Sequence, residues 1–90
     1  MGTAAVKMKF MPSSPEVDLE EIKNEIIKIL NNEEVKNPGF EEEPIAFGLK
    51  AVIVTFGWPE EKELEPLEKA FSEIENVNSV QLIDMRRAIG

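Results

Sequence analysis

The sequence of 90 residues is short, acidic and free of the side chains that most catalytic and metal sites use. Its net charge of −8 comes from 18 acidic and 10 basic residues, which argues against an extended nucleic-acid footprint because phosphate neutralisation needs clustered Lys and Arg. Cys, His and Tyr are absent, which excludes a thiolate nucleophile, a cysteine metal site and a His general base. We expect one domain over residues 1–90, with no cofactor and no metal.

The N-terminal stretch from Met1 to Met11 is apolar but includes Lys7 and Lys9. It therefore lacks the uninterrupted apolar region of a signal peptide. No window approaches the ~20 apolar residues that a membrane span needs. These features predict a cytoplasmic protein without a membrane partner.

The first third of the chain predicts a strand followed by a helix. Residues 4–11 alternate, with Val6, Met8 and Phe10 on one side, which is typical of a half-buried strand. Asp18 is placed to cap a helix, with Glu21 three residues later as in a capping box. An apolar stripe at spacings of three and four predicts this helix over Leu19–Asn31.

The remaining residues predict two strands, a second helix and a last strand. Phe40–Ile45 is polar and carries Pro44, which favours an edge strand, whereas the apolar run Leu49–Phe56 favours a central one. Gly57-Trp58-Pro59 is expected to end that strand. The second helix is predicted over Leu64–Glu75, with Pro66 in its first turn. A final strand would alternate Val80, Leu82 and Asp84 with Gln81, Ile83 and Met85.

The order of strand, helix, strand, strand, helix, strand is that of the split βαβ arrangement. It predicts an α+β fold of the ferredoxin-like βαββαβ type. Two helices would cover one face of a four-stranded antiparallel sheet, and the other face would stay open.

The hairpin segment from Pro44 to Lys50 is the first candidate site. Gly48 can take a positive φ without steric cost, as a tight turn requires. The turn does not require the large ring of Phe47. Two interpretations stay open: the ring folds back over the edge of the core, or it is presented to a partner, since aromatic anchors dominate interface energetics.

Arg86-Arg87 is the second candidate, because it is the one adjacent basic pair in an acidic chain. It is either a solvated strand end or a charged tip that reaches into a partner. The acidic runs Glu41-Glu42-Glu43 and Glu60-Glu61 are better explained as solvated charge than as a cation site, since consecutive carboxylates on a strand alternate faces.

Together these residues resemble a known family. The segment Pro44-Ile45-Ala46-Phe47-Gly48-Leu49-Lys50, the apolar strand after it and the stretch Val80–Met85 are similar to elongation factor 1-beta. This family is the guanine-nucleotide exchange factor of elongation factor 1-alpha, and the short length resembles its archaeal form. The resemblance implies a chain without catalytic groups of its own, which binds the GDP-bound and nucleotide-free GTPase and no nucleic acid directly.

The resemblance also implies roles for named residues. Phe47 occupies the aromatic position that lies in the partner interface, with Pro44, Ile45, Gly48 and Lys50 around it. Eukaryotic relatives have a Lys near the C-terminus that reaches toward the magnesium and phosphate region of the GTPase. This chain has no Lys there, which leaves Arg86 and Arg87 as candidates for a related task.

An alternative from another class is a small regulatory module on the same fold, which would dimerise and bind a small ligand.

Overall fold

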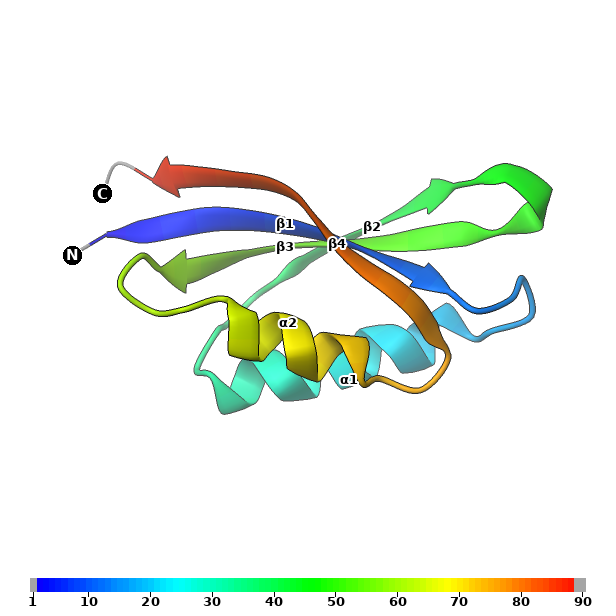
Figure 1. Ribbon diagram of the computed structural model, residues 1–90, viewed down its shortest axis with the longest axis horizontal. Coiled ribbons are helices and arrows are strands. Elements are labelled where there is room, and N and C mark those ends of the chain that lie inside the picture. The colour runs from blue at the N-terminus through cyan, green and yellow to red at the C-terminus, as the bar shows by residue number, and fades with distance from the viewer. Residues whose placement is uncertain (1, 89–90) are drawn as a thin grey trace.

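The computed structural model describes residues 2–88 and confirms the ferredoxin-like α+β fold (Figure 1). One antiparallel sheet has the strand order β2-β3-β1-β4, and the two helices lie against one of its faces. The elements in chain order are β1 Thr3–Pro12, α1 Leu19–Asn32, β2 Gly39–Pro44, the 3-10 turn η1 Ala46–Gly48, β3 Lys50–Pro59, α2 Glu65–Ser72 and β4 Val77–Ala88.

The core lies between the sheet and the helices, and the alternation predicted for β1 places its side chains there. Val6, Met8 and Phe10 are fully buried, and the ring of Phe10 meets that of Phe71 on α2 edge-on at 5.0 Å between centroids. The predicted stripe of α1 contributes Ile22, Ile26 and Leu30. Burial of these apolar side chains holds the two layers together.

Helix α1 begins as predicted at a capped Asp18, although the cap is not a capping box. The Asp18 carboxylate accepts from the N–H of Glu20 at 3.0 Å, one residue earlier than the capping box would require. The helix then runs to Asn32, one residue past the predicted end.

The prediction that Gly57-Trp58-Pro59 ends the central strand is wrong. These three residues continue β3, where Gly57 pairs with Ala5 and Trp58 pairs with Ala4. The Trp58 side chain is buried in the core, and this burial outweighs the turn signal of its neighbours. Pro59 is the last residue of the strand, where its missing N–H is tolerated.

Helix α2 is shorter than predicted and β4 is longer. The helix ends at Ser72, and Ile74 is buried beyond it in a turn. Strand β4 begins at Val77 and runs to Ala88, so it includes the arginine pair.

A bulge in β4 changes the predicted alternation of that strand. Lys7 of β1 pairs with Asp84, but Met8 pairs with Leu82, so Ile83 is the extra residue. After the bulge Met85 lies on the same face as Leu82, because it pairs with the core residue Val6. The period-two prediction therefore assigned Met85 and Asp84 to the wrong faces.

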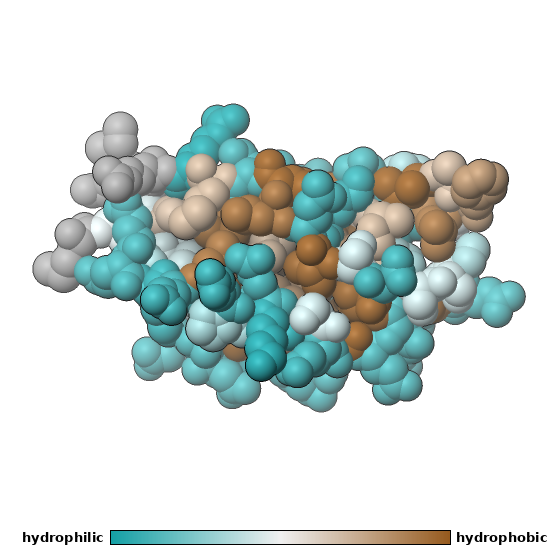
Figure 2. All heavy atoms as spheres, in the orientation of Figure 1, coloured by the Kyte–Doolittle hydropathy of each residue, from teal (hydrophilic) through white to brown (hydrophobic). Residues whose placement is uncertain are grey.

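The face of the sheet away from the helices carries no helix among residues 2–88 (Figure 1). In the view of Figure 2, hydrophobic surface gathers along the sheet, while hydrophilic side chains cover the helical side. None of the helices in the described part of the chain is long and apolar enough to cross a membrane.

Candidate protein-interaction site

The hairpin between β2 and β3 forms one end of the molecule, far from the start of β1 and the end of β4 (Figure 1). Pro44 and Lys50 are its last paired residues. The turn is closed by two backbone bonds: the N–H of Ile45 donates to the carbonyl of Leu49 at 2.7 Å, and the N–H of Leu49 donates to Ala46 at 3.3 Å. Strand β2 is an edge strand, as its polar sequence and Pro44 predicted.

Phe47 lies at the tip of this hairpin and is 92% exposed. The interpretation in which its ring folds back over the core is therefore wrong. Its backbone is in the left-handed region, at φ 64° and ψ 30°, and Gly48 follows at φ 77°. A bulky residue rarely adopts a positive φ, and doing so stores about 1–2 kcal/mol of strain. The turn thus holds a large apolar ring in solvent at a conformational cost.

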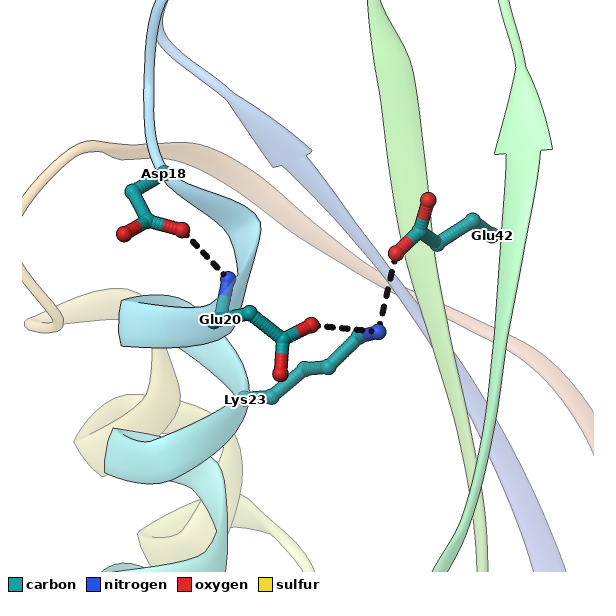
Figure 3. A network of polar contacts seen from close by, with 4 residues as sticks. All are labelled: Asp18, Glu20, Lys23 and Glu42. Atoms are coloured by element: carbon teal, nitrogen blue, oxygen red, sulfur yellow. Dashed lines mark hydrogen bonds and ion pairs between the residues drawn. The ribbon is translucent and has the colours of Figure 1, made fainter.

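Two lysines hold the β2 side of the hairpin, one on each face of the sheet. On the helix side, Lys23 Nζ of α1 lies 2.8 Å from Glu42 Oε2 and 3.0 Å from Glu20 Oε2 (Figure 3). On the open face, Lys9 Nζ of β1 lies 3.4 Å from Glu43 Oε1. Two of the three carboxylates in the run from residue 41 to 43 are thus in ion pairs, whereas the sequence suggested only solvated charge.

The charges of the Lys23–Glu42 pair stabilise each other. The pKa of Lys23 is raised, chiefly by its hydrogen bond to Glu42 and next by that to Glu20. The pKa of Glu42 is lowered, chiefly by the hydrogen bond from Lys23. Because the pKa of Glu42 is lowered in the folded state, its ion pair stabilises the fold at pH values above the unfolded pKa near 4.5. Because the pKa of Lys23 is raised, its ion pairs stabilise the fold at pH values below the unfolded pKa near 10.5. The pair therefore stays charged at every pH between these two values.

The arginine pair lies in β4 near the chain termini, at the opposite end of the sheet (Figure 1). Arg86 pairs with Ala5 of β1, and its Nε lies 3.1 Å from Asp84 Oδ2. The side chain of Arg86 is 81% exposed. Only the backbone of Arg87 is described, and it pairs with Ala4.

The structure thus does not bring the two predicted groups of site residues together. Arg86 is level with Gly57 on β3, because both pair with Ala5. Gly57 is seven residues along the strand from Lys50, which corresponds to about 23 Å. The molecule measures 42 × 22 × 20 Å, so the two groups are separated along its longest axis. A partner that contacts both groups must extend along most of the domain.

The sequence did not indicate Lys23 and Glu42, whose ion pair links the hairpin to α1. No motif marks them, because residues 19 apart along the chain meet only after α1 packs on the sheet. It also missed the exposed apolar residues around the bulge of β4, namely Leu82, Ile83 and Met85. Among residues 2–88, no three acidic side chains are grouped closely enough to hold a metal ion.

Comparison with known proteins identifies the family of the chain. Residues 5–88 match the EF-1 guanine nucleotide exchange domain. Elongation factor 1-beta of Methanosarcina barkeri is 43% identical over 88 residues, which cover 97% of this chain and 99% of that protein. The proteins of the same name from Methanocaldococcus jannaschii and Methanococcus maripaludis strain C7 are 39% and 40% identical over 89 and 87 residues. These alignments cover 98% and 94% of this chain and 100% and 97% of those proteins. The chain therefore belongs to the EF-1 guanine nucleotide exchange domain family.

Proposed function

We propose that this protein promotes the exchange of GDP for GTP on elongation factor 1-alpha through two contact regions at opposite ends of its sheet. The first region is the hairpin with Pro44, Ile45, Phe47, Gly48 and Lys50, and the second comprises Arg86 and Arg87. Membership of the exchange-domain family supports the activity. The GTPase regains its GTP-bound form when GTP enters the emptied nucleotide site.

The observation that carries the assignment of the hairpin is Phe47, 92% exposed in a strained left-handed conformation. Strain of this kind persists only where the surrounding structure holds it, and it is concentrated at functional sites. An exposed aromatic ring can fill an apolar pocket of a partner and become a hot spot. Ile45, half-buried beside the tip, and the paired residues Pro44 and Lys50 would help to set the direction in which the ring enters.

Exchange needs no catalytic group on the factor. It needs binding that is tighter to the nucleotide-free GTPase than to the GDP-bound form, because only a differential affinity shifts an equilibrium. By linkage, the factor then weakens GDP binding by the same ratio by which GDP weakens factor binding. Exchange therefore requires no chemical step on this chain.

Arg86 and Arg87 would supply part of the difference in affinity between the nucleotide-free and the GDP-bound GTPase. A guanidinium group donates a fork of hydrogen bonds that fits carboxylates and phosphates. Arg86 is exposed and bonded only to its neighbour Asp84 among the ion pairs described, so a stronger acceptor on the partner can replace that contact. Contacts to the groups that hold GDP would destabilise the nucleotide-bound state.

The remaining features support a protein partner over others. The net charge of −8 opposes direct binding to nucleic acid. We infer that residues 1–90 act as a single exchange domain and that they work in the cytoplasm, where elongation takes place. The alternative of a ligand-binding dimer has no comparable observation behind it.

The test is the release of labelled GDP from elongation factor 1-alpha of an archaeal relative, measured with and without this chain. We expect release to accelerate with the concentration of the chain and to saturate. Phe47→Ala should shift the half-saturating concentration upward. An unchanged rate of GDP release at saturating chain would refute the proposed function.

A further inference from the structure

The hairpin that carries Phe47 has little support of its own. Strand β2 is bonded to β3 on one side, and no strand of the described part of the chain pairs with its other edge. A depression of about 190 Å³ is lined by Gly48 and Lys50 of the hairpin and by residues 12–19, among them Pro12, Ser14 and Pro15. Two-stranded ribbons twist strongly when they extend beyond the rest of a sheet. The direction of the tip therefore depends on contacts along β2.

The contact with the helix layer is made by Lys23. Glu42 pairs with the core residue Val52, so its side chain lies on the helix side of the sheet. There Lys23 Nζ bonds it at 2.8 Å (Figure 3). Glu42 comes two residues before Pro44, the last paired residue of β2.

Lys23 is itself held in place. Glu20, one turn earlier on α1, accepts a second bond from Lys23 Nζ at 3.0 Å. The backbone N–H of Glu20 is in turn bonded by the capping carboxylate of Asp18 (Figure 3). Only 18% of the Lys23 side chain is exposed, although it is charged. An ammonium group fixed by two carboxylates from two elements acts as a tie between α1 and the hairpin.

We propose that Lys23 is a positioning residue for nucleotide exchange: through Glu42 it ties the hairpin to helix α1 and sets the direction in which Phe47 is presented. This inference rests on the proposed function. Without the tie, the hairpin samples more twist, and only a fraction of molecules present the ring correctly. The apparent dissociation constant rises in inverse proportion to that fraction.

The chain offers a matched pair of variants, Glu42→Gln and Glu20→Gln. Each removes one negative charge and one of the two carboxylates that hold Lys23. Only Glu42→Gln breaks the bond between the hairpin and α1, because Glu20 belongs to the same helix as Lys23, while the bond from Lys9 to Glu43 stays in both variants. Lys28→Met is a further control, since Lys28 pairs with Glu25 within α1 at 2.9 Å.

The first readout is GDP release as a function of the concentration of the chain. If a third of the molecules keep a competent tip, Glu42→Gln raises the half-saturating concentration about threefold, with the maximal rate unchanged. Lys28→Met should match the parental chain, and Glu20→Gln, which leaves the bond from Lys23 to Glu42 in place, should raise the half-saturating concentration less than Glu42→Gln does. The charge-swapped double variant Lys23→Glu with Glu42→Lys should recover the parental value, because Lys at position 42 can again bond carboxylates at positions 20 and 23.

The second readout needs no partner. Backbone ¹⁵N relaxation of the free protein should show lower order at Ile45 and Phe47 in Glu42→Gln, and a smaller loss of order in Glu20→Gln. Melting temperatures of the two variants should be similar, which separates positioning from general destabilisation.

The outcomes distinguish the positioning role of Lys23 from the proposed function. If the parental chain stimulates GDP release and Glu42→Gln behaves like Glu20→Gln in both readouts, the positioning role is wrong and the proposed function stands. If the order at the tip falls while the half-saturating concentration stays parental, the positioning role is equally wrong. If the parental chain does not stimulate release, the proposed function fails, and this inference fails with it.

Discussion

Two large aromatic side chains with opposite environments lie near the two ends of the central strand β3. Phe47, three residues before the strand, is 92% exposed, whereas Trp58, near its end, is 2% exposed. Trp58 packs edge-on against Phe56 at 6.1 Å, and its Nε1–H donates to the carbonyl of Lys62 at 3.1 Å. Burial of the Trp58 ring stabilises the fold, while the strain at Phe47 opposes it. The same strand therefore has a ring buried in the core near its end and follows closely after a ring that lies in solvent.

The largest effect expected from this comparison is on stability at Trp58. Trp58→Ala should lower the free energy of unfolding by about 3–5 kcal/mol, because it removes a buried indole and leaves a cavity. Urea denaturation monitored by circular dichroism measures this loss. Trp58→Phe is the control, since it keeps an aromatic ring and mainly leaves the carbonyl of Lys62 without its donor, at about 1–3 kcal/mol. A loss below that of Trp58→Phe would mean that the indole contributes little to the core.

At Phe47 the expected effect is on binding and not on stability. Phe47→Ala should weaken binding to the GTPase by about 2 kcal/mol, roughly thirtyfold, with little loss of stability. Binding curves and thermal melts on the same variant measure the two effects. A large fall in melting temperature with unchanged binding would show that the ring packs against the protein in solution.

The contrast also explains what the sequence could predict. The elements with repeated apolar patterns, β1 and α1, were predicted to within two residues, because their burial follows from period alone. Trp58 was misread, since its neighbours Gly57 and Pro59 signal a turn and only the packed core shows why the strand continues. The bulge at Ile83 was missed because one inserted residue leaves no local mark in an apolar stretch.

The sequence predicted the residues of the candidate site but not their positions relative to one another. Phe47 stands out in the sequence because a turn does not need its ring, and the arginine pair stands out against the acidic background. Their separation along the sheet follows from the direction of β4, which only the topology fixes. The link from Lys23 to Glu42 depends on how α1 lies against β2, and no spacing rule gives that.

The arginine end should act on rate more than on affinity. Replacing Arg86 and Arg87 together with Ala should slow GDP release at saturating chain more than it weakens association, because these groups would compete for contacts that hold the nucleotide. The effect should shrink as salt rises, since exposed charges are screened over about 8 Å at physiological ionic strength. Stopped-flow exchange across a salt series measures both dependences.

A matched control for this variant lies on the helices. Lys28→Ala with Lys69→Ala removes the same total charge from the two helices. If this control slows exchange as much as the arginine variant does, the effect is one of net charge and the arginine end has no specific role.

The smallest expected effect tests the strain at Phe47 directly. At a φ of 64° an alanine keeps the steric clash of a Cβ, whereas a glycine has none. Against this gain, glycine loses more backbone entropy on folding, by about 0.4–1 kcal/mol. Relief of about 1–2 kcal/mol of strain should still leave Phe47→Gly more stable than Phe47→Ala, by up to about 1.6 kcal/mol.

Binding separates this effect from the role of the ring. Both variants lack the aromatic side chain, so both should bind the GTPase equally weakly while they differ in urea midpoint. If Phe47→Gly is instead the less stable of the two, the left-handed conformation is not strained in solution. The exposed ring would then be presented without a conformational cost, and the contrast with Trp58 would be one of burial alone.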